Sequence, residues 1–228
     1  MKTIFVTGTD TGVGKTLVSR LLIEYFVAQG LKVAPMKPVA SGADWTNNQL
    51  YNEDALTLIN AANCELDYSS VNPYVFQPPI APHIAAAKNK TSIKLKKLNQ
   101  CYQMLSSVSD CVIVEGAGGW QVPLNSQYSM ADWVSQNQWP VVLVVGLRLG
   151  CINHARLSYL DILAKNNVLA GWVINTIDAN TLEAEAIIND LIQYIDAPFL
   201  GCIPWLPKEQ LEGKQAADSL DFSQLTML

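Results

Sequence analysis

Several charged residues stand directly after apolar segments, where they could act on phosphate groups. The segment Gly8–Thr16 reads GTDTGVGKT and lies between an apolar, β-rich run over Thr3–Thr7 and a helical pattern. Such a loop between a strand and a helix holds phosphate oxygens with backbone N–H groups and the positive end of the helix. Lys15 would then reach the terminal phosphates, and the Thr16 hydroxyl would bind Mg²⁺. The segment therefore predicts a nucleoside triphosphate site.

This phosphate loop departs from the general pattern at one position. The pattern G-x-x-x-x-G-K-S/T places its first glycine at position 9, where Thr9 stands, and Gly8 lies one residue earlier. The alternative is a glycine-rich β–α turn with a surface lysine, which the preceding strand and following helix disfavour. Kinases, ligases and molecular switches all use such a loop, so the loop alone leaves the reaction open.

Two carboxylates are candidates for holding the metal ion. Glu115 ends the apolar run Cys111–Glu115 and precedes a glycine-rich turn. An acidic residue at this place in phosphate-loop proteins helps to hold Mg²⁺, although Asp is the usual residue. Asp54, near the start of a predicted helix, is a second candidate ligand. The alternatives are a surface carboxylate at a strand end for Glu115 and a first-turn acid favoured by the helix dipole for Asp54.

A second lysine follows another predicted strand. Lys37 comes directly after Lys32–Met36, at the start of the sequence KPVASG. If this strand lies parallel to Thr3–Thr7, Lys37 and Ser41 reach the same sheet edge as the phosphate loop. The lysine could neutralise an anionic substrate there, and the serine could form a hydrogen bond to it. The alternative is a solvated lysine in a turn.

The elements that would position these residues alternate along the chain. Near-continuous apolar runs such as Val141–Val145 indicate strands buried on both faces of a sheet. Gly30 suits the C-terminal cap of the first helix, which follows the phosphate loop. The predicted strands are Thr3–Thr7, Lys32–Met36, Cys111–Glu115, Val141–Gly146, Ala170–Asn175 and Phe199–Pro204. The further predicted helices are Glu53–Ala62, Ser92–Ser107, Met130–Gln138, Ile152–Asn166 and Thr181–Ile195.

This alternation predicts an α/β fold with right-handed crossovers. Ser92 and Thr181 suit the N-caps of their helices. The proline-rich stretch Asn72–Pro82 is expected to be an irregular loop, too short and too apolar to separate domains. We expect one P-loop NTPase-type domain over residues 1–228, with a mostly parallel central sheet flanked by helices on both faces. The polar segment Lys208–Leu228 has no clear pattern.

Composition and charge argue against several classes of function. Half of the 228 residues are hydrophobic and 15% are charged, as in a compact globular protein. The net charge of −5 disfavours a nucleic-acid binder, and the apolar runs fall short of the roughly 18 residues that span a bilayer. The five cysteines indicate neither a disulfide framework nor a zinc site, because they are widely spaced and odd in number. We expect a cytoplasmic protein without nucleic-acid or membrane partners.

Together, these segments resemble the dethiobiotin synthetase family. The matching stretches occur in order from residue 6 to residue 206, which is nearly the whole chain, and several are long and peculiar to that family. They are Val6–Thr16, Lys37–Gly42, Asp54–Leu56, Val71–Tyr74, Pro82–His83, Val114–Trp120, Ala131–Val134, Leu143–Ala155, Leu169–Asn175 and Leu200–Leu206.

The resemblance implies an ATP- and Mg²⁺-dependent ligase of biotin biosynthesis that works as a homodimer. In this family, 7,8-diaminopelargonic acid, CO₂ and ATP give dethiobiotin, ADP and phosphate. One amine takes up CO₂ as an N-carbamate, ATP phosphorylates the carbamate to a carbamic-phosphoric anhydride, and the second amine closes the ring. Positioning and charge neutralisation dominate phosphoryl transfer, which suits a site built from lysines, carboxylates and a metal ion.

The resemblance also implies roles for individual residues. Lys37 and Lys15 are the catalytic residues, and the Mg²⁺ ligands are Thr16, Asp54 and Glu115. The residues expected to bind the diamine are Thr11, Ser41, Gly150, Cys151 and Asn153, the last three in a segment that crosses the dimer interface. The residues expected to bind ATP are Gly12, Val13, Gly14, Lys15, Thr16, Leu17, Asp54, Glu115, Gly116, Ala117, Gly118, Asn175, Thr176, Pro204, Trp205 and Leu206.

The sequence departs from the family pattern at three places. Gly12 replaces an acidic residue that is common in the phosphate loop, and Arg148 stands where a lysine is expected. Arginine keeps the charge at position 148 and changes its geometry. The stretch Asn175–Asp178 partly matches the guanine-reading pattern N-K-x-D, but it lacks the lysine. Asn175 is still expected to read adenine.

Two other classes of protein remain as alternatives. A nucleotide-gated switch of the same fold typically carries an extra lysine early in the loop, where Asp10 stands here. Such a switch hydrolyses ATP with a protein partner, whereas the enzyme hydrolyses it only with diamine and bicarbonate. A non-enzymatic dinucleotide-binding module is disfavoured because no G-x-G-x-x-G follows the first strand.

Overall fold

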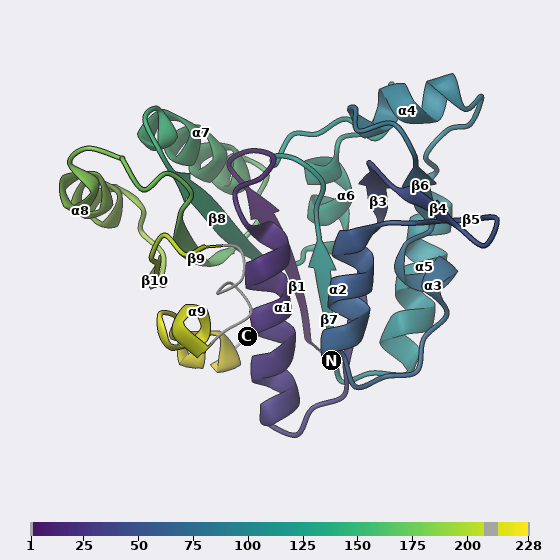
Figure 1. The fold of residues 1–228 in the computed structure, drawn as a ribbon, viewed down its shortest axis with the longest axis horizontal. Helices are drawn as coiled ribbons and strands as arrows, with labels where there is room; N and C mark the ends of the chain where they lie inside the picture. Colours follow the sequence, from purple (N-terminus) through teal and green to yellow (C-terminus); the bar gives the residue numbers. More distant parts are fainter. Residues whose placement is uncertain (1, 208–213, 228) are drawn as a thin grey trace.

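A six-stranded parallel β-sheet forms the centre of the computed structural model, which describes residues 2–207 and 214–227. The strand order is β10-β9-β8-β1-β7-β2 (Figure 1). These are the six strands that the sequence predicts, with ends shifted by no more than one residue. They are β1 (Lys2–Gly8), β2 (Val33–Met36), β7 (Cys111–Glu115), β8 (Val141–Leu147), β9 (Leu169–Thr176) and β10 (Phe199–Ile203).

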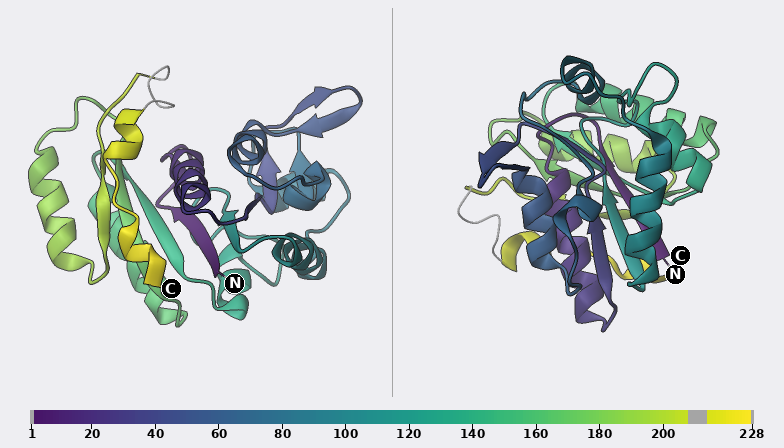
Figure 2. Two further views of the ribbon diagram at one scale, coloured as in Figure 1. Left: turned by 90° about the horizontal axis from the view of Figure 1, so that it is seen from below. Right: turned by 90° about the vertical axis from the view of Figure 1, so that its right-hand side faces the viewer.

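Helices cover both faces of this sheet (Figure 2). Alternate residues of a buried strand point to opposite faces, so Phe5 packs in one hydrophobic cluster while Ile4 and Val6 pack in the other. The helices on the face of Ile4 and Val6 are α1 (Lys15–Ala28) and α2 (Glu53–Ala61). Those on the face of Phe5 are α5 (Leu95–Ser107), α6 (Met130–Asn137), α7 (Cys151–Ala164) and α8 (Ala184–Tyr194).

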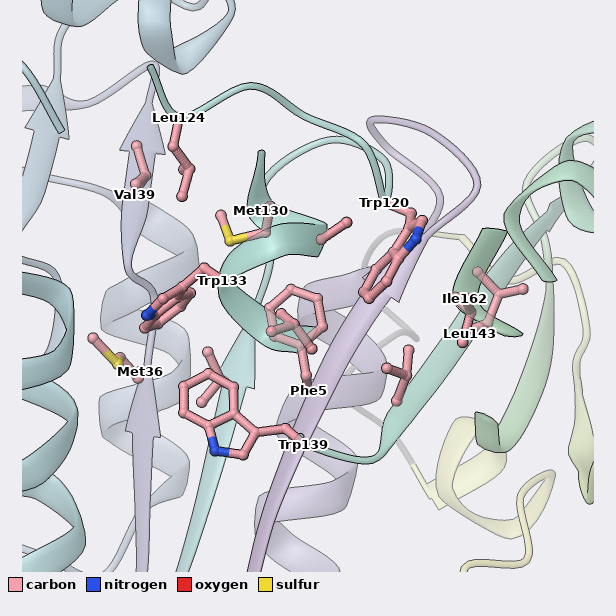
Figure 3. Packing of buried hydrophobic residues seen from close by; sticks show 14 of the residues in the cluster. Phe5, Met36, Val39, Trp120, Leu124, Met130, Trp133, Trp139, Leu143 and Ile162 are labelled. Atoms are coloured by element: carbon pink, nitrogen blue, oxygen red, sulfur yellow. The ribbon is translucent and has the colours of Figure 1, made fainter. Parts of the chain in front are cut away.

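Aromatic side chains fill the cluster around Phe5 (Figure 3). The rings of Trp133 and Trp139 meet edge to face with centroids 4.9 Å apart, and Trp120 meets Phe5 at 6.1 Å. Trp133 is fully buried, and its indole N–H donates to Asn99 Oδ1 at 2.7 Å. The large rings therefore bury apolar area while this buried donor is satisfied. This packing anchors β1, whose carboxyl end carries the phosphate loop.

Short elements lie beside the main sheet, and one of them corrects the sequence prediction. The expected irregular loop Asn72–Pro82 contains the strand β6 (Tyr74–Phe76), which pairs in parallel with β3 (Val39–Ser41). Tyr74 and Phe76 are buried, so this segment is extended to place both rings in the core. The remaining short elements are the antiparallel strands β4 (Asp44–Thr46) and β5 (Gln49–Tyr51) and the helices α3 (Tyr68–Val71) and α4 (Pro82–Lys88).

The predicted N-cap of α5 is wrong. The helix begins at Leu95, with extended Lys94 at the cap position, and Ser92 lies outside it. Ile93 is fully buried in the core, and this anchor keeps the preceding chain extended. Core packing thus overrides the local capping preference of Ser92.

The predicted N-cap of α8 is wrong as well, whereas the C-cap of α1 is confirmed. α8 begins at Ala184, after Glu183, whose φ of 54° is outside the right-handed helical region. The Thr181 hydroxyl donates to the Asp178 carbonyl at 2.9 Å instead of accepting from a helical N–H. Gly30 follows the end of α1 with a φ of 83°, and its N–H donates to the Val27 carbonyl at 2.9 Å. A glycine with positive φ is the usual residue at this place.

The C-terminal segment returns to α1. It contains α9 (Lys214–Asp218) and a 3₁₀ helix, Ser223–Met227, and the ring of Phe222 packs on Tyr25 with centroids 5.6 Å apart. Of the segment Lys208–Leu228, residues 208–213 and 228 lie outside the described part. Within that part, no helix is long and apolar enough to cross a membrane.

Candidate active site

The carboxyl ends of β1, β2 and β7 surround a cavity of about 770 Å³. Ligands bind at this edge of open α/β sheets, because the loops that follow parallel strands meet there. The phosphate loop forms one wall, and the segments after β2 and β7 form others. In the part of the chain that the structure describes, the cavity is lined by Asp10, Thr11, Gly12, Gly14, Lys15, Thr16, Lys37, Ala40, Ser41, Asp54, Pro79, Ile80, Ala81, Pro82, Glu115, Ala117, Gly118, Gly119, Val122 and Pro123.

A side chain from β9 holds the phosphate loop in place. Asn175 Nδ2 donates to the Val13 carbonyl at 3.0 Å. The next residue, Gly14, has a φ of 95°, and a Cβ there would lie 2.3 Å from Asn175 Nδ2. Glycine at position 14 therefore permits both the backbone conformation and the close approach of Asn175.

Lys15 places an ammonium group in the cavity wall. It is the first residue of α1, and its Nζ donates to the Asp10 carbonyl at 2.8 Å. Burial, together with the neighbouring charge of Lys37, lowers the pKa of Lys15 to about 8. Two lysine side chains thus line one cavity, which favours a ligand of high negative charge.

Lys37 is buried between two carboxylates. Its Nζ donates to Glu115 Oε1 at 2.5 Å and to Asp54 Oδ2 at 2.8 Å. Burial alone would lower the pKa of Lys37, but the two carboxylates outweigh burial and raise it. Lys37 is therefore protonated at neutral pH, and its charge is directed at the cavity that it lines.

The carboxylate of Glu115 has an unused oxygen beside the phosphate loop. Its Oε1 accepts from the Thr16 hydroxyl at 2.9 Å, while its buried Oε2 has no hydrogen-bond partner in the described part of the chain. Burial raises the pKa of Glu115, against the effect of Lys37. One ammonium group touches both Glu115 and Asp54, so the two carboxylates converge on a single cation.

These oxygens fit a Mg²⁺ ion. Carboxylates and a hydroxyl are the hard ligands that Mg²⁺ takes, and an unpaired buried oxygen such as Glu115 Oε2 gains by binding a cation. Among residues 2–207 and 214–227, no group of three or more His, Cys, Asp and Glu side chains could hold a metal ion. Further ligands would therefore come from nucleotide phosphates and water, as is usual for this ion.

Known proteins match nearly the whole chain. Residues 2–212 match the family model described as an AAA domain. The ATP-dependent dethiobiotin synthetase of Aeromonas salmonicida is 45% identical over 207 residues, which cover 90% of this chain and 92% of that protein. That of Escherichia coli K12 is 44% identical over 216 residues, covering 93% and 96%. The chain belongs to the dethiobiotin synthetase family.

Solved structures of other proteins share the fold of this chain. The cell division protein MinD of Aquifex aeolicus superposes with a TM-score of 0.58, at 18% identity, over 96% of this chain and 93% of that one. A ParA family ATPase of Chlorobium tepidum superposes with a TM-score of 0.56, at 16% identity, over 100% and 96%. At such low identity the likeness shows the fold alone.

The structure brings the central residues of the dethiobiotin synthetase motifs together in the cavity. Lys15, Lys37 and the two carboxylates line it, although they come from four separate segments. Ser41 lines it too, and its buried hydroxyl oxygen has no hydrogen-bond partner among the described residues. The other expected site residues in the lining are Thr11, Gly12, Gly14, Thr16, Ala117 and Gly118.

Other residues expected from the dethiobiotin synthetase resemblance lie outside the described lining of this cavity. Val13 and Gly116 are next to lining residues, and Leu17 lies in the first turn of α1. Asn175 and Thr176 end β9, and the segment Pro204–Leu206 follows β10, with Trp205 49% exposed. Gly150, Cys151 and Asn153 begin α7, beyond the end of β8.

The apolar wall of the cavity was missed by sequence reasoning. It consists of Ala40, the segment Pro79–Pro82, Val122 and Pro123. The signal available was the apolar composition of the loop Asn72–Pro82, which is unusual for a surface loop. A cavity lined by both apolar residues and two lysines suits a substrate with a hydrocarbon chain and charged groups.

Proposed function

We propose that this chain is an ATP-dependent dethiobiotin synthetase that carboxylates 7,8-diaminopelargonic acid with CO₂ and closes the cyclic urea of dethiobiotin. The observation that carries the proposal is the buried Lys37, held between Glu115 and Asp54 in the same cavity as Lys15 of the phosphate loop. A phosphate loop serves many reactions, but a second buried ammonium beside it suits an anionic acceptor of the phosphoryl group. A carbamate is such an acceptor.

The reaction proceeds in three steps. An amine nitrogen of the diamine attacks CO₂ and loses a proton, which gives an N-carbamate anion. A carbamate oxygen attacks the γ-phosphorus of ATP and ADP leaves, which gives a carbamic-phosphoric anhydride. The second amine then attacks the carbonyl carbon, loses a proton and expels phosphate, which closes the ring.

The two lysines neutralise charge during these steps. Lys37 is fixed by two carboxylates, so its ammonium needs little rearrangement to stabilise the carbamate. Lys15 donates one N–H to a backbone carbonyl, and its other two N–H groups are available to the transferred phosphoryl group, which carries the largest developing charge. The hydroxyls of Thr11 and Ser41 are placed on the cavity wall to hold the reacting end of the diamine.

Thr16, Asp54 and Glu115 are the residues proposed to hold Mg²⁺. When bound, the ion would neutralise part of the negative charge of the ATP phosphates. Asp54 and Glu115 already form ion pairs with Lys37. A bound metal ion would therefore share these two carboxylates with the lysine.

The nucleotide base is proposed to bind between β9 and the segment after β10. Asn175 and Thr176 end β9, and Pro204–Leu206 would line the other side of the purine. The partly exposed ring of Trp205 is available for such a contact. The residues proposed to surround the phosphates are Gly12, Val13, Gly14, Leu17, Gly116, Ala117 and Gly118. We favour adenine over guanine because Thr176 stands where the guanine-reading pattern has lysine.

A homodimer would complete the diamine site. Gly150, Cys151 and Asn153 lie at the start of α7, apart from the cavity of their own chain, and they are proposed to hold the carboxylate end of the diamine across the interface. Leu149, Leu157 and Leu160 are 96%, 59% and 49% exposed on this segment. Exposed apolar side chains gathered on one helix and the turn before it are typical of an interface.

We further infer that residues 1–228 form one domain in a cytoplasmic protein. Both hydrophobic clusters pack on the same central sheet, which leaves no boundary between separate cores in the described residues. All five cysteines are free thiols, as suits a reducing compartment. The partners are proposed to be small molecules and a second copy of the chain, and neither nucleic acid nor membrane.

ATP turnover tests this function against the nucleotide-gated switch. With Mg²⁺ and ATP, phosphate release should need both diaminopelargonate and bicarbonate, and one ADP should form for each dethiobiotin. Omission of the diamine should reduce release to background. Turnover that ignores the diamine and responds to a protein partner would contradict the proposal.

A further inference from the structure

An ion pair connects the phosphate loop to the segment before α7. Arg148 Nη2 donates to Asp10 Oδ2 at 2.5 Å. The other carboxylate oxygen of Asp10 accepts from the Thr11 N–H at 2.7 Å, and the Asp10 carbonyl accepts from Lys15 Nζ at 2.8 Å. Asp10 therefore links Arg148 to an ammonium group that lines the cavity.

The backbone of Arg148 shapes the turn that begins α7. Arg148 directly follows β8, and its carbonyl accepts from the Cys151 N–H at 3.1 Å. Gly150, inside this turn, has a φ of 92°, which glycine adopts without strain. One residue thus contacts the phosphate loop with its side chain and the Leu149–Cys151 turn with its backbone.

This ion pair is poorly placed to stabilise the fold. The side chains of Arg148 and Asp10 are 41% and 45% exposed, and pairs so exposed contribute little to stability. The hydrogen bond from the Thr11 N–H, together with the hydrogen bond and charge of Arg148, holds the pKa of Asp10 below its usual value. Asp10 is therefore ionised at neutral pH, and the pair is present under conditions in which the protein works.

We propose that Arg148 is a positioning residue, which holds Asp10 so that its carbonyl keeps the Lys15 ammonium aimed into the cavity. The same contact ties the geometry of the phosphate loop to the turn that begins α7. The expected effect on catalysis rests on the proposed function, whereas the expected effect on nucleotide binding does not. Loss of the contact should lower kcat more than it raises KM for ATP, because small misplacements of a charged group cost most in the transition state.

The test is a double-mutant cycle with Arg148→Ala and Asp10→Asn. The amide oxygen of Asn at position 10 can still accept from the Thr11 N–H, whereas its NH₂ group cannot accept from Arg148. Two quantities are measured for each variant: kcat for dethiobiotin formation, and the Kd for Mg·ADP by displacement of a fluorescent ADP. The binding measurement needs no diamine, so it stays informative if no dethiobiotin forms.

We expect each single variant to lower kcat about tenfold and to weaken Mg·ADP binding about threefold. The double variant should be no worse than either single variant, because both remove one shared contact. Arg148→Lys should stay within about threefold of the native kcat, since lysine keeps the charge and can still donate a hydrogen bond to Asp10. Thermal unfolding midpoints should move by less than about 3 °C.

Arg156→Ala is the matched control. Arg156 also lies on the α7 side of the molecule in a half-exposed pair, with Asp190 at 3.1 Å, but it contacts neither the phosphate loop nor the described cavity lining. Its kcat and Mg·ADP affinity should match those of the native protein. Native values of both quantities for Arg148→Ala would overturn the proposal. The proposal would also be overturned if the decreases in kcat and in Mg·ADP affinity of the two single variants multiplied in the double variant. Arg148 would then act on the ligand independently of Asp10.

Discussion

Lys37 is the residue on which the proposed chemistry depends most. Lys37→Ala should lower the rate of ring closure at least about 10³-fold, because it removes a fixed positive charge from the site of the carbamate. It should also destabilise the fold by about 3 kcal/mol, since Glu115 is left buried without its partner. The measurements are dethiobiotin formation by mass spectrometry and urea unfolding.

A second variant separates the two effects of this change. In Lys37→Ala combined with Glu115→Gln, the buried negative charge is gone, and most of the lost stability should return. The rate should stay low. Full activity in Lys37→Ala would rule out the role given to this lysine.

Lys15 predicts a pH dependence of nucleotide binding. Its pKa is lowered to about 8, mainly by burial, so the free protein loses this positive charge as the pH rises through 8. Because the phosphates favour the protonated form, the Kd for Mg·ADP should rise with pH above about 8, by up to tenfold per pH unit. Fluorescent ADP titrations between pH 7 and 9.5 measure this. In Lys15→Arg the affinity should not vary over that range, and a parallel rise there would assign the effect to another group.

The sequence predicts the charged residues of the site but not their contacts. Glu115 ends a strand of a parallel sheet, and Lys15 and Lys37 follow two others, so their meeting at one edge of the sheet follows from the strand order. The contact between Asp10 and Arg148 joins residues 138 positions apart, and its form depends on the rotamers that packing selects. The hydrogen bond from the Asn175 amide to the Val13 carbonyl could not be predicted from the sequence either.

At the scale of elements, α6 offers a direct test of local capping. Ser129 and Asp132 form a capping box, and the hydrogen bond from Lys165 lowers the pKa of Asp132 to about 2. Asp132→Ala should cost about 1 kcal/mol at pH 7, measured by urea unfolding. Since the folded-state pKa is depressed, this stabilisation is present above pH 4 and lost as the pH falls from about 4 to 2.

Asp67 is the matched control for this prediction. It occupies the N-cap position of α3, but its side chain makes no cap hydrogen bond. Asp67→Ala should therefore change the free energy of unfolding by less than about 0.5 kcal/mol. An equal cost for the two variants would show that the hydrogen bonds of the capping box are unimportant.

Elements with strong patterns could be predicted, and elements defined by distant contacts could not. Most residues of the six central strands are apolar, and burial of a strand on both faces of a sheet produces such apolar runs in the sequence. β3 and β6 are three residues each and depend on pairing with one another, so local pattern gives little sign of them. The start of α5 is set by the burial of Ile93, a tertiary contact that outweighs the capping preference of Ser92.

At the scale of the whole molecule, the exposed leucines of α7 predict a dimer. The native protein should have twice the 25.0 kDa chain mass in light scattering. Leu157→Glu combined with Leu160→Glu should shift it to the monomer and raise KM for the diamine, because Gly150, Cys151 and Asn153 would no longer reach a partner. Met104→Glu, at a residue 55% exposed on α5, is the control and should stay dimeric. A native monomer with full activity would contradict this assembly.

The most direct test of the proposed function follows the carbon of bicarbonate. The native protein is incubated with Mg·ATP, diaminopelargonate and carbon-labelled bicarbonate, and the product is analysed by mass spectrometry and carbon NMR. We expect the label in the ureido carbonyl of dethiobiotin, with one ADP formed per ring, and no labelled product from Lys37→Ala. Hydrolysis of ATP without label in a cyclic urea would contradict it.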